Sequence, residues 1–325
     1  MKLVEVRNVK KYFPVQKGFI DQIISGKQTF VKAVDDVSFY VKKGEVLGLA
    51  GESGSGKTTM GRLCVRLIEP TEGQILFDGQ DIAPLKGKQL RLMKRRIQFT
   101  FQDPTSSLNP RLTIGEAIAD ALKLQGIGEK DEQEGRAREV LERVGLAPAA
   151  SFYNRLPHQL SGGQKQRVVF GRAIVLNPEF IVTDEPVAMV DVSIKAQILE
   201  LMMDLKRDLN LTYLFISHDL STARHVCDYI AIMYLGKLIE IADKDQIYED
   251  PLHPYSQGLM SAIPIPDPKA QKAAPIPKGE IPSPIDPPSG CRFHPRCPKA
   301  FDKCSKEEPE LISVGNGRVV ACHLY

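Results

Sequence analysis

The sequence lacks tryptophan, long apolar runs and any marked excess of one charge. Without tryptophan, ligand binding has to be followed with a labelled ligand. No apolar stretch approaches the roughly 18 residues of a membrane-spanning helix, and the charged start, Met-Lys-Leu-Val-Glu-Val-Arg, is unlike a secretion signal. The 43 Lys and Arg against 40 Asp and Glu leave a net charge of +3, with no basic patch interleaved with aromatics, so nucleic-acid binding is not expected. We expect a cytosolic chain that reaches a membrane only through partners.

A glycine-rich loop follows the first strongly apolar segment. Residues 45–50 predict a buried strand, residues 51–58 read Gly-Glu-Ser-Gly-Ser-Gly-Lys-Thr, and residues 58–68 predict a helix. Strand, glycine-rich loop and helix in this order bind nucleotide phosphates, because glycine lets backbone N–H groups turn toward them. The lysine adds a positive charge, and the threonine hydroxyl can ligate Mg²⁺. The candidate nucleotide-binding residues are Gly51, Glu52, Ser53, Gly54, Ser55, Gly56, Lys57, Thr58 and Thr59.

Other apolar segments end in side chains suited to phosphoryl transfer, which needs positioned charges more than covalent chemistry. The strand predicted from residue 179 ends at Asp184, a candidate Mg²⁺ ligand, and Glu185, a candidate to polarise the attacking water. An acidic pair at a strand end is by itself more often a solvated turn, and the phosphate loop favours the catalytic interpretation. His218 follows a strand predicted from residue 212 and is a candidate contact to the γ-phosphate. Gln102, after the stretch 97–101, can ligate Mg²⁺ or orient water.

Taken together, these segments resemble the ATP-binding subunit of ABC transporters over the whole chain. Residues 51–58 correspond to the Walker A motif, 180–185 to the Walker B motif, and 160–164, Leu-Ser-Gly-Gly-Gln, to the ABC signature. The resemblance implies an α/β P-loop ATPase fold with a RecA-like core. It also implies that ATP is hydrolysed by the catalytic residues Glu185, His218 and Gln102, with Mg²⁺ held by Thr58, Gln102 and Asp184.

In that family two cassettes close head to tail on two ATP molecules. The resemblance implies that the partner's ATP is contacted by Ser161, Gly162, Gly163, Gln164 and Asp191. Tyr12 falls where the family stacks an aromatic ring on adenine, with Phe13 as the alternative. Residues 188–191 read Ala-Met-Val-Asp where the family usually has Ser-Ala-Leu-Asp, so the aspartate is kept and a serine hydroxyl is lost.

Shorter segments are similar to the ATPases of dipeptide and oligopeptide importers; they are residues 51–54, 101–111, 253–255, 279–284 and 290–297. Within this group, residues 31–39 and 59–62 resemble the F-type (DppF/OppF-like) subunit. This resemblance implies a peripheral protein at the cytoplasmic face of the cell membrane. Its partners would be a D-type ATPase subunit, two permease subunits and an extracellular or periplasmic peptide-binding protein. The alternatives are an importer of sugars or other solutes, a soluble ABC ATPase of translation or DNA repair, and a non-hydrolysing regulatory partner.

The expected organisation has three parts. They are a RecA-like nucleotide-binding core (residues 1–103 and 177–242), a helical subdomain with the signature (104–176) and a C-terminal extension (243–325). Helical spacing of apolar residues predicts helices over 113–122 and 136–144. A third helix should place one apolar face in the core, formed by Ile194, Ile198, Leu201, Leu205 and Leu209. Nine prolines between 264 and 288 predict an extended linker.

Four of the six cysteines, Cys291, Cys297, Cys304 and Cys322, lie in the last 35 residues. Disulfides are disfavoured in the cytosol, and the spacing lacks the C-x2-C pairs of zinc fingers. Four thiolates suit a [4Fe–4S] cluster, and the resemblance favours it, because peptide-importer ATPases include members with a cluster in this segment. Zinc, with His294 or His323 replacing a thiol, and unmetallated thiols or a disulfide are the alternatives. Any metal is expected to be the main stabiliser of the extension, whereas Cys64 and Cys227 should be buried in helices.

Overall fold

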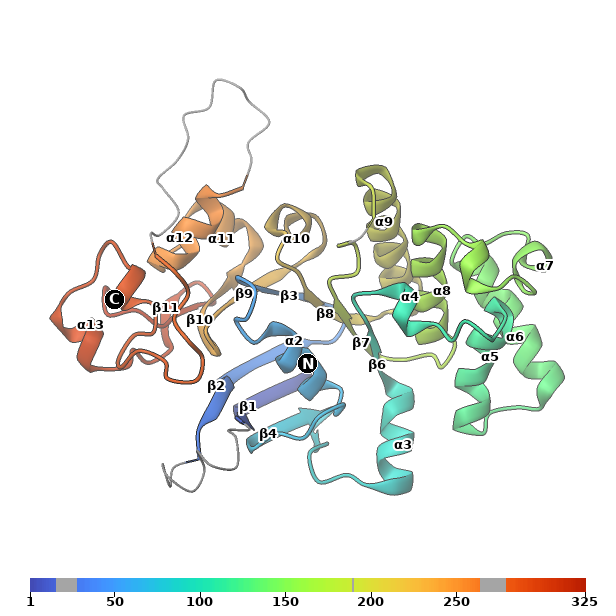
Figure 1. The fold of residues 1–325 in the computed structure, drawn as a ribbon, viewed down its shortest axis with the longest axis horizontal. Helices are drawn as coiled ribbons and strands as arrows, with labels where there is room; N and C mark the ends of the chain where they lie inside the picture. Colours follow the sequence, from blue (N-terminus) through green and yellow to red (C-terminus); the bar gives the residue numbers. More distant parts are fainter. Residues whose placement is uncertain (16–27, 189, 264–278) are drawn as a thin grey trace. The chain divides into compact units, whose positions relative to one another are not determined.

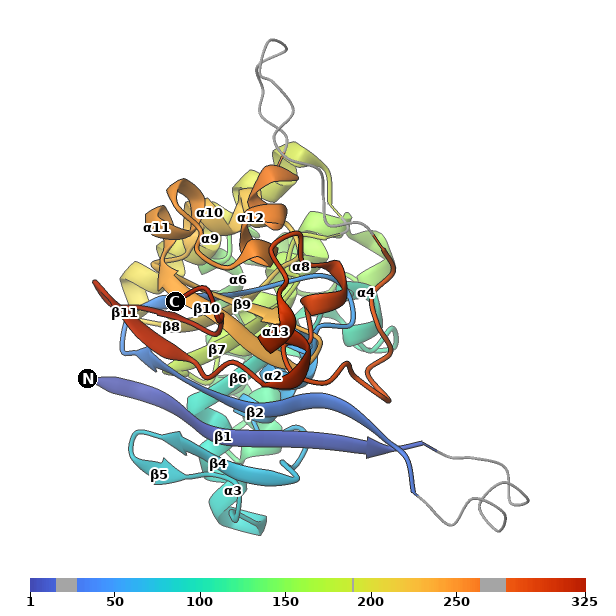
Figure 2. The same cartoon turned by 90° about the vertical axis from the view of Figure 1, so that its left-hand side faces the viewer.

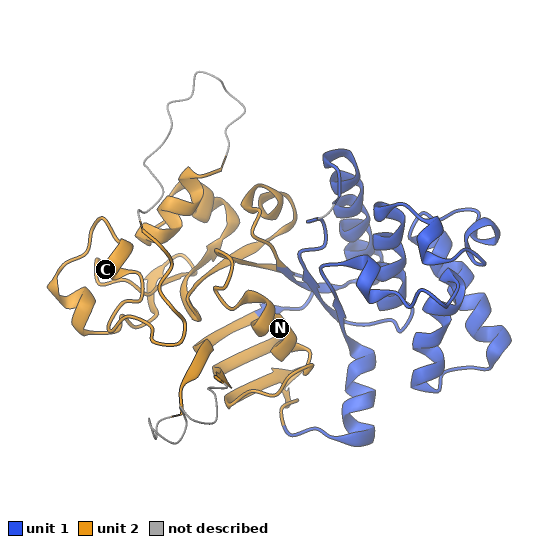
Figure 3. Cartoon of the chain, viewed as in Figure 1, with its two compact units in different colours: residues 1–3, 41–45, 84–215 blue, residues 4–40, 46–83, 216–325 orange. Residues whose placement is uncertain are grey.

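The computed structural model describes residues 1–15, 28–188, 190–263 and 279–325. The chain forms two compact units (Figure 3): residues 1–3, 41–45 and 84–215 make the first, and residues 4–40, 46–83 and 216–325 the second. Each unit contains strands and helices, in agreement with the predicted α/β class. The boundaries of the predicted core, helical subdomain and extension differ from this division and stay predictions.

The second unit contains a four-stranded sheet in the order β2-β1-β4-β5 (Figure 2). Its strands are β1 (Lys2–Pro14), β2 (Phe30–Lys42), β4 (Glu72–Phe77) and β5 (Gln80–Asp81), and β4 runs antiparallel to β1 and β5. Ile75 and Phe77 are buried on one face of β4, while the residue between them is only half-buried. This alternation is typical of a sheet that covers a core with one face.

A second sheet of this unit has the order β11-β12-β10-β9-β3. The strands are β3 (Val46–Ala50), β9 (Tyr229–Tyr234), β10 (Lys237–Asp243), β11 (Ile312–Gly315) and β12 (Arg318–Val320). β3 and β9 run parallel, and every residue of β3 is buried. The continuous apolar run of β3 follows from this burial on both faces. A two-residue turn, Leu235-Gly236, with φ angles of 45° and 82°, joins β9 to the antiparallel β10.

The helices of the second unit are short. They are α2 (Lys57–Cys64), α10 (Leu220–Val226), α11 (Lys244–Glu249), α12 (Pro254–Ser261) and α13 (Asp302–Lys306), with one 3₁₀ turn, η2 (His294–Arg296). α10 packs on β3, and α11 packs on β9, β10 and α12 (Figure 1). Cys64 ends α2 and Cys227 caps the end of α10, and both are buried, as predicted.

The first unit carries strands in the order β8-β7-β6: β6 (Ile97–Thr100), β7 (Phe180–Asp184) and β8 (Thr212–Ile216). β6 and β7 run parallel, and all residues of β7 and β8 are buried. The strands predicted before Gln102 and Glu185 are therefore present. Their carboxyl ends bring the side chains that follow to one edge of this sheet.

The helices of the first unit include the predicted ones. They are α3 (Gly87–Arg96), α4 (Pro104–Ser107), α5 (Ile114–Gln125), α6 (Lys130–Arg143), α7 (Ala149–Phe152), α8 (Gly162–Ile174) and α9 (Val192–Leu209), with the 3₁₀ turn η1 (Pro157–Gln159). α5 and α6 correspond to the helices predicted over 113–122 and 136–144. On α9 the predicted apolar face is buried at Ile198, Leu201 and Leu205, whereas Ile194 and Leu209 near its ends are only half-buried.

The C-terminal extension has an apolar core, which the sequence interpretation missed. The Phe293 ring is 1% exposed and packs against Tyr234, Tyr255 and His253, with ring centroids 5.3, 5.3 and 5.7 Å away. β12 also extends the sheet beside β10. Burial of one such ring contributes about 2 kcal/mol, so apolar packing adds to the stability of the extension, and the stabilising role of a metal stays a prediction.

The proline-rich segment is described only in part. Residues 279–288 form neither helix nor strand, and the Lys32 N–H on β2 donates a hydrogen bond to the Pro284 oxygen. Residues 264–278 lie outside the described residues. Among the helices that the structure describes, none has the length and apolar character of a membrane span.

Candidate nucleotide site

The glycine-rich loop joins β3 to α2, as predicted. Gly51 has a φ angle of 146°, and a Cβ atom there would lie 2.2 Å from the Met233 backbone oxygen. Gly56 has a φ angle of 103°, and its Cβ would lie 2.2 Å from the Ala33 oxygen. Only glycine tolerates both this backbone conformation and this close approach. The loop can therefore take its shape only with glycine at these two positions.

Lys57 is held inside the loop. Its Nζ donates hydrogen bonds to the backbone oxygens of Gly51 and Glu52, at 2.7 and 2.8 Å, and lies 3.3 Å from Ser55 Oγ. The side chain is buried. The ammonium group is thus positioned within the loop, where it can form charge-assisted hydrogen bonds to a phosphate.

The tip of the loop is open to solvent, and the end of the loop begins the helix. Ser53 and Gly54 are exposed, and Thr58 and Thr59 are half-buried in the first turn of α2. The residue before the helix, Gly56, has no side chain that could cap it. The first N–H groups of α2 can therefore bond to an anion.

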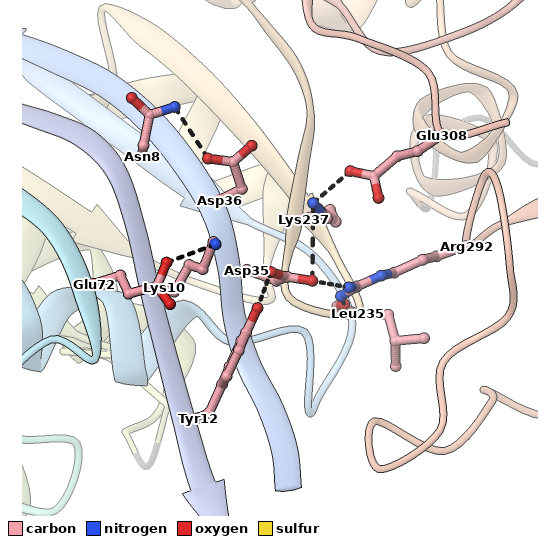
Figure 4. Close-up of polar contacts among 10 residues, drawn as sticks. All are labelled: Asn8, Lys10, Tyr12, Asp35, Asp36, Glu72, Leu235, Lys237, Arg292 and Glu308. Carbon is pink, nitrogen blue, oxygen red and sulfur yellow. Dashed lines mark hydrogen bonds and ion pairs between the residues drawn. The ribbon is translucent and has the colours of Figure 1, made fainter.

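Tyr12 on β1 is fixed by its hydroxyl, which donates a hydrogen bond to Asp35 on β2 (Figure 4). Burial, followed by this bond, raises the pKa of Tyr12. The Lys32 ammonium group lies 5.9 Å from the Tyr12 ring centroid. Phe13, the alternative partner for adenine, is 38% exposed. The held position of Tyr12 favours it as the stacking residue, which stays a prediction.

His218 belongs to the second unit and follows the end of β8. Its side chain is exposed, and the next residue, Asp219, caps α10 by accepting a hydrogen bond from the Thr222 N–H at 3.3 Å. The histidine is therefore placed just before a helix start, on the rigid end of a strand. Its role at the γ-phosphate stays a prediction.

In the first unit the structure brings together two predicted catalytic side chains. Gln102 Nε2 donates a hydrogen bond of 2.8 Å to Glu185 Oε2. Glu185 itself has a φ angle of 48°, in the left-handed region that costs a non-glycine residue about 1 kcal/mol. Such strain concentrates at functional sites. The strained backbone of Glu185 and its bond to Gln102 are therefore consistent with a functional role of this side chain.

The predicted Mg²⁺ ligands are divided between the units. Asp184, which ends β7 and is buried, and Gln102, which is exposed, belong to the first unit. Thr58 belongs to the second unit. Carboxylate, amide and hydroxyl oxygens are suitable donors for this ion. The joint ligand set stays a prediction.

The signature residues form the start of α8. Ser161 caps the helix: its Oγ accepts a hydrogen bond from the Gln164 N–H at 3.3 Å, and Gln164 Oε1 accepts one from the Ser161 N–H at 3.0 Å. Gly162 is exposed, whereas Gly163 is buried, and a Cβ atom there would lie 2.5 Å from Ile194 Cγ2 on α9. The exposed start of a capped helix is suited to an anion. The contact with a partner's ATP stays a prediction.

Asp191 occupies the residue before α9 and is exposed. In the segment 188–191, residue 189 lies outside the described residues. The consequence of the altered segment therefore stays a prediction, as does the contact of Asp191 with a partner.

The four C-terminal cysteines lie near one another. Burial, with smaller contributions from the charges of Cys322, Cys304 and Cys297, raises the pKa of the Cys291 thiol to about 11. The Cys291 N–H donates a hydrogen bond of 2.8 Å to the Cys304 oxygen. Within the described ranges, however, no three or more His, Cys, Asp or Glu side chains are arranged to hold a metal ion. The donor chemistry fits a metal, whereas the arrangement gives the predicted [4Fe–4S] cluster no support.

Other residues near the phosphate loop were missed by the sequence interpretation. Arg296 and Tyr255 bond to Glu52, and Arg292 bonds to Asp35. The sequence did mark the segments 253–255 and 290–297 as similar to peptide importers. It gave no sign that their side chains reach the nucleotide-binding motifs.

Comparison with known proteins agrees with this geometry. A family model described as ABC transporter matches residues 34–188, and a model described as oligopeptide/dipeptide transporter, C-terminal region, matches residues 239–304. The oligopeptide transport ATP-binding protein AppF of Bacillus subtilis is 48% identical over 326 residues, which cover 99% of this chain and 97% of the relative. A probable peptide ABC transporter ATP-binding protein of Sinorhizobium fredii is 44% identical over 323 residues, 99% of this chain and 90% of the relative.

A solved structure matches as well. It is a dimeric ATP-binding cassette in a post-hydrolysis state, bound to ADP and Pi, with a TM-score of 0.64 and 30% identity. The match covers 74% of this chain and 98% of the cassette. Full-length sequence identity, the two family models and the cassette fold all agree. The chain therefore belongs to the ATP-binding subunits of ABC transporters, within the oligopeptide/dipeptide transporter family.

Proposed function

We propose that this chain is the ATP-hydrolysing subunit that powers import of dipeptides or oligopeptides through an ABC transporter. The observation that carries the proposal is the hydrogen bond between Gln102 and Glu185. It places the predicted base and the predicted water-orienting amide side by side, beyond the end of a buried strand. The names of the full-length relatives, which specify peptide or oligopeptide transport, support the substrate class.

The proposal gives each predicted residue a role. The phosphates of ATP accept hydrogen bonds from the loop N–H groups and from Lys57, which exchanges its bonds to the loop oxygens for bonds to phosphate. Glu185 accepts a proton from the attacking water, and Gln102 and His218 orient the water and the γ-phosphate. Thr58, Gln102 and Asp184 would hold Mg²⁺, which would neutralise negative charge on the phosphates.

The proposed assembly is a head-to-tail pair with a D-type ATPase subunit at the cytoplasmic face of the membrane. Two permease subunits and an extracellular or periplasmic binding protein complete the assembly. The permease and the binding protein select the substrate. Each cassette offers its signature helix to the partner's ATP. The matching solved cassette is itself dimeric, which supports the pairing.

Substitution of Glu185 tests the ATPase proposal. Glu185→Gln should keep nucleotide binding and lower ATP turnover by at least a hundredfold, because a general base contributes about 10²- to 10⁴-fold. It should also trap an ATP-bound dimer, seen by gel filtration. Glu179→Gln is a matched control on the same segment, because Glu179 pairs with Arg96 instead of Gln102. Turnover in Glu185→Gln equal to that of the wild type would refute the assignment.

The transport proposal has a separate test. The tagged chain should copurify with permease subunits, and peptide-loaded binding protein should raise the ATPase rate of the reconstituted complex. Copurification with ribosomes or DNA would favour a soluble ABC ATPase of translation or repair. Stimulation by a sugar-binding protein instead would change the substrate class and leave the ATPase proposal intact.

We further propose that the four C-terminal thiols bind a metal, as a [4Fe–4S] cluster or, alternatively, as a zinc site. The mutual proximity of the four thiols supports this proposal, since metal ions are held by several thiolates in one place. Protein purified without oxygen should be brown and hold about four irons per chain. Cys291→Ser should lose them, and Cys64→Ser, a buried control, should keep them. Colourless protein without iron or zinc would end this proposal.

A further inference from the structure

The loop between Cys291 and Cys297 carries two buried arginines that reach the predicted nucleotide site from the C-terminal extension. Arg292 and Arg296 are 7% and 8% exposed. Buried guanidinium groups are costly unless charged partners compensate them. The partner of Arg296 is Glu52 in the phosphate loop, and the partner of Arg292 is Asp35, which bonds to Tyr12.

Arg296 holds the phosphate loop. Its Nη1 and Nη2 donate hydrogen bonds of 2.8 and 3.1 Å to the two carboxylate oxygens of Glu52, the second residue of the loop. The Glu52 N–H donates to the Tyr255 hydroxyl at 2.9 Å, and the Glu52 oxygen accepts from Lys57 Nζ at 2.8 Å. The extension thus fixes Glu52 at side chain and backbone, and Glu52 in turn fixes the lysine.

Arg292 holds the other end of the site. It donates hydrogen bonds to Asp35 and to the Leu235 backbone oxygen, and Asp35 accepts from the Tyr12 hydroxyl. Figure 4 shows Asp35 between Tyr12 on one side and Arg292 and Lys237 on the other. The turn that Arg292 bonds also touches the loop, because the Gly236 N–H donates to the Ser55 oxygen at 2.9 Å.

The loop that bears the two arginines is itself fixed. Phe293 lies between them in the sequence and is buried against the rings of Tyr234, Tyr255 and His253. The Cys291 backbone is bonded to Cys304. The arginines therefore project from a rigid base, which a positioning role requires.

We infer that Arg296 and Arg292 are positioning residues for ATP: Arg296 sets the phosphate loop through Glu52, and Arg292 sets the adenine-stacking ring through Asp35. This inference rests on the proposed ATP site. The C-terminal extension then supports the nucleotide site. A substitution in its Cys291–Cys297 loop changes nucleotide affinity although the substituted residue does not itself contact ATP.

The test compares Arg296→Gln with Arg318→Gln in the full chain. Arg318 is a matched control: it is 9% exposed in the same extension and pairs with Asp250 and Glu240, away from the phosphate loop. Arg296→Gln should weaken binding of ribose-labelled ATP about tenfold, because small displacements in a site cost up to about a hundredfold. Amide hydrogen exchange of residues 51–56 should rise without nucleotide. Arg318→Gln should lower the melting temperature but change neither quantity.

Arg292→Gln should give a different signature. It frees the Tyr12 ring, so it should narrow the affinity ratio of labelled ATP to labelled CTP, whereas Arg296→Gln should weaken both nucleotides alike. If Arg296→Gln fails to fold, Arg296→Lys keeps the charge and loses the two-pronged contact. It then serves the same comparison, with an intermediate loss of affinity.

A double variant tests whether Arg296 acts through Glu52. The affinity of Glu52→Gln/Arg296→Gln should match that of Arg296→Gln within about twofold, as expected for residues in one interaction. Two results would overturn the inference. One is a double variant whose loss of affinity is the product of the two single losses, and the other is an Arg296→Gln variant whose affinity and amide exchange equal those of Arg318→Gln. In both cases, Lys57-dependent binding of ATP by the wild type would leave the proposed function standing. A wild type that does not bind ATP would refute both.

Discussion

At the scale of single residues, the phosphate loop depends on contacts that allow no substitution. Gly51 and Gly56 each approach a backbone oxygen too closely for a Cβ atom. The Lys57 ammonium group donates hydrogen bonds to two backbone oxygens of the loop. A bound phosphate would accept charge-assisted hydrogen bonds from this ammonium group in exchange for those to the loop oxygens.

Lys57→Ala should therefore lose nucleotide affinity by at least tenfold, since it removes a charge-assisted contact to phosphate. Titration with labelled ATP measures the loss. Lys123→Ala on the exposed face of α5 is the control and should bind like the wild type. Equal affinities for the two variants would show that the loop does not bind the phosphates.

At the scale of elements, tertiary contacts decided where the helices end. The helix predicted to residue 68 ends at Cys64, because Arg66 takes a left-handed conformation, with a φ angle of 56°, and donates a hydrogen bond of 2.9 Å to the Ala83 oxygen. α6 begins at Lys130, earlier than its apolar pattern predicts. Asp131 and Glu132 in its first turn favour an N-terminus electrostatically.

The start of α12 gives this unit a pH dependence. His253 caps the helix: its Nδ1 accepts a hydrogen bond from the Tyr255 N–H at 3.0 Å, and burial lowers the pKa of His253 to about 3. An unfolded histidine takes a proton near pH 6.5. Between pH 6.5 and 3 the unfolded state binds more protons, so the free energy of unfolding falls as the pH drops through this range, by up to about 1.4 kcal/mol per pH unit.

His253→Asn should weaken this acid dependence, because asparagine can cap a helix and carries no titrating group. The melting temperature measured from pH 7 to pH 4 should fall less steeply than in the wild type. His158→Asn, at an exposed position, is the control. A slope unchanged in His253→Asn would show that another group dominates the acid response.

At the scale of the whole molecule, one subunit is expected to supply only half of each working site. Ser161 and Thr113 both cap helices, and both have the reciprocal bonds of a capping box. Only Ser161 lies in the signature. A comparison of substitutions at Ser161 and Thr113 therefore distinguishes the loss of a helix cap from the loss of a contact in the assembled dimer.

Ser161→Ala and Thr113→Ala should each cost about 1 kcal/mol of stability, the usual loss of an N-cap. Only Ser161→Ala should lower the ATPase rate of the assembled pair with the second subunit, by about tenfold or more. Thermal unfolding and the ATPase rate of the reconstituted complex are the two measurements. Equal ATPase rates for both variants would argue against a signature that acts on the partner's ATP.

The sequence alone determined the local motifs of this protein. The phosphate loop, the signature helix and the strand that ends at Asp184 are built from consecutive residues, whose spacing prescribes a conformation with little help from elsewhere. Family membership followed from the same local segments. The two compact units were not predictable in this way, because they combine distant parts of the chain.

Only the tertiary structure decided how the extension joins the nucleotide site. Arg296 bonds to a residue 244 positions away, and Arg292 to one 257 positions away. Their sequence context, between two cysteines and beside prolines, favours a metal loop. Long-range partners leave no periodic or spacing signal, because the fold brings them together only after each local element has formed. The rigid loop around Phe293, and with it the support of the phosphate loop, is therefore a property of the folded chain.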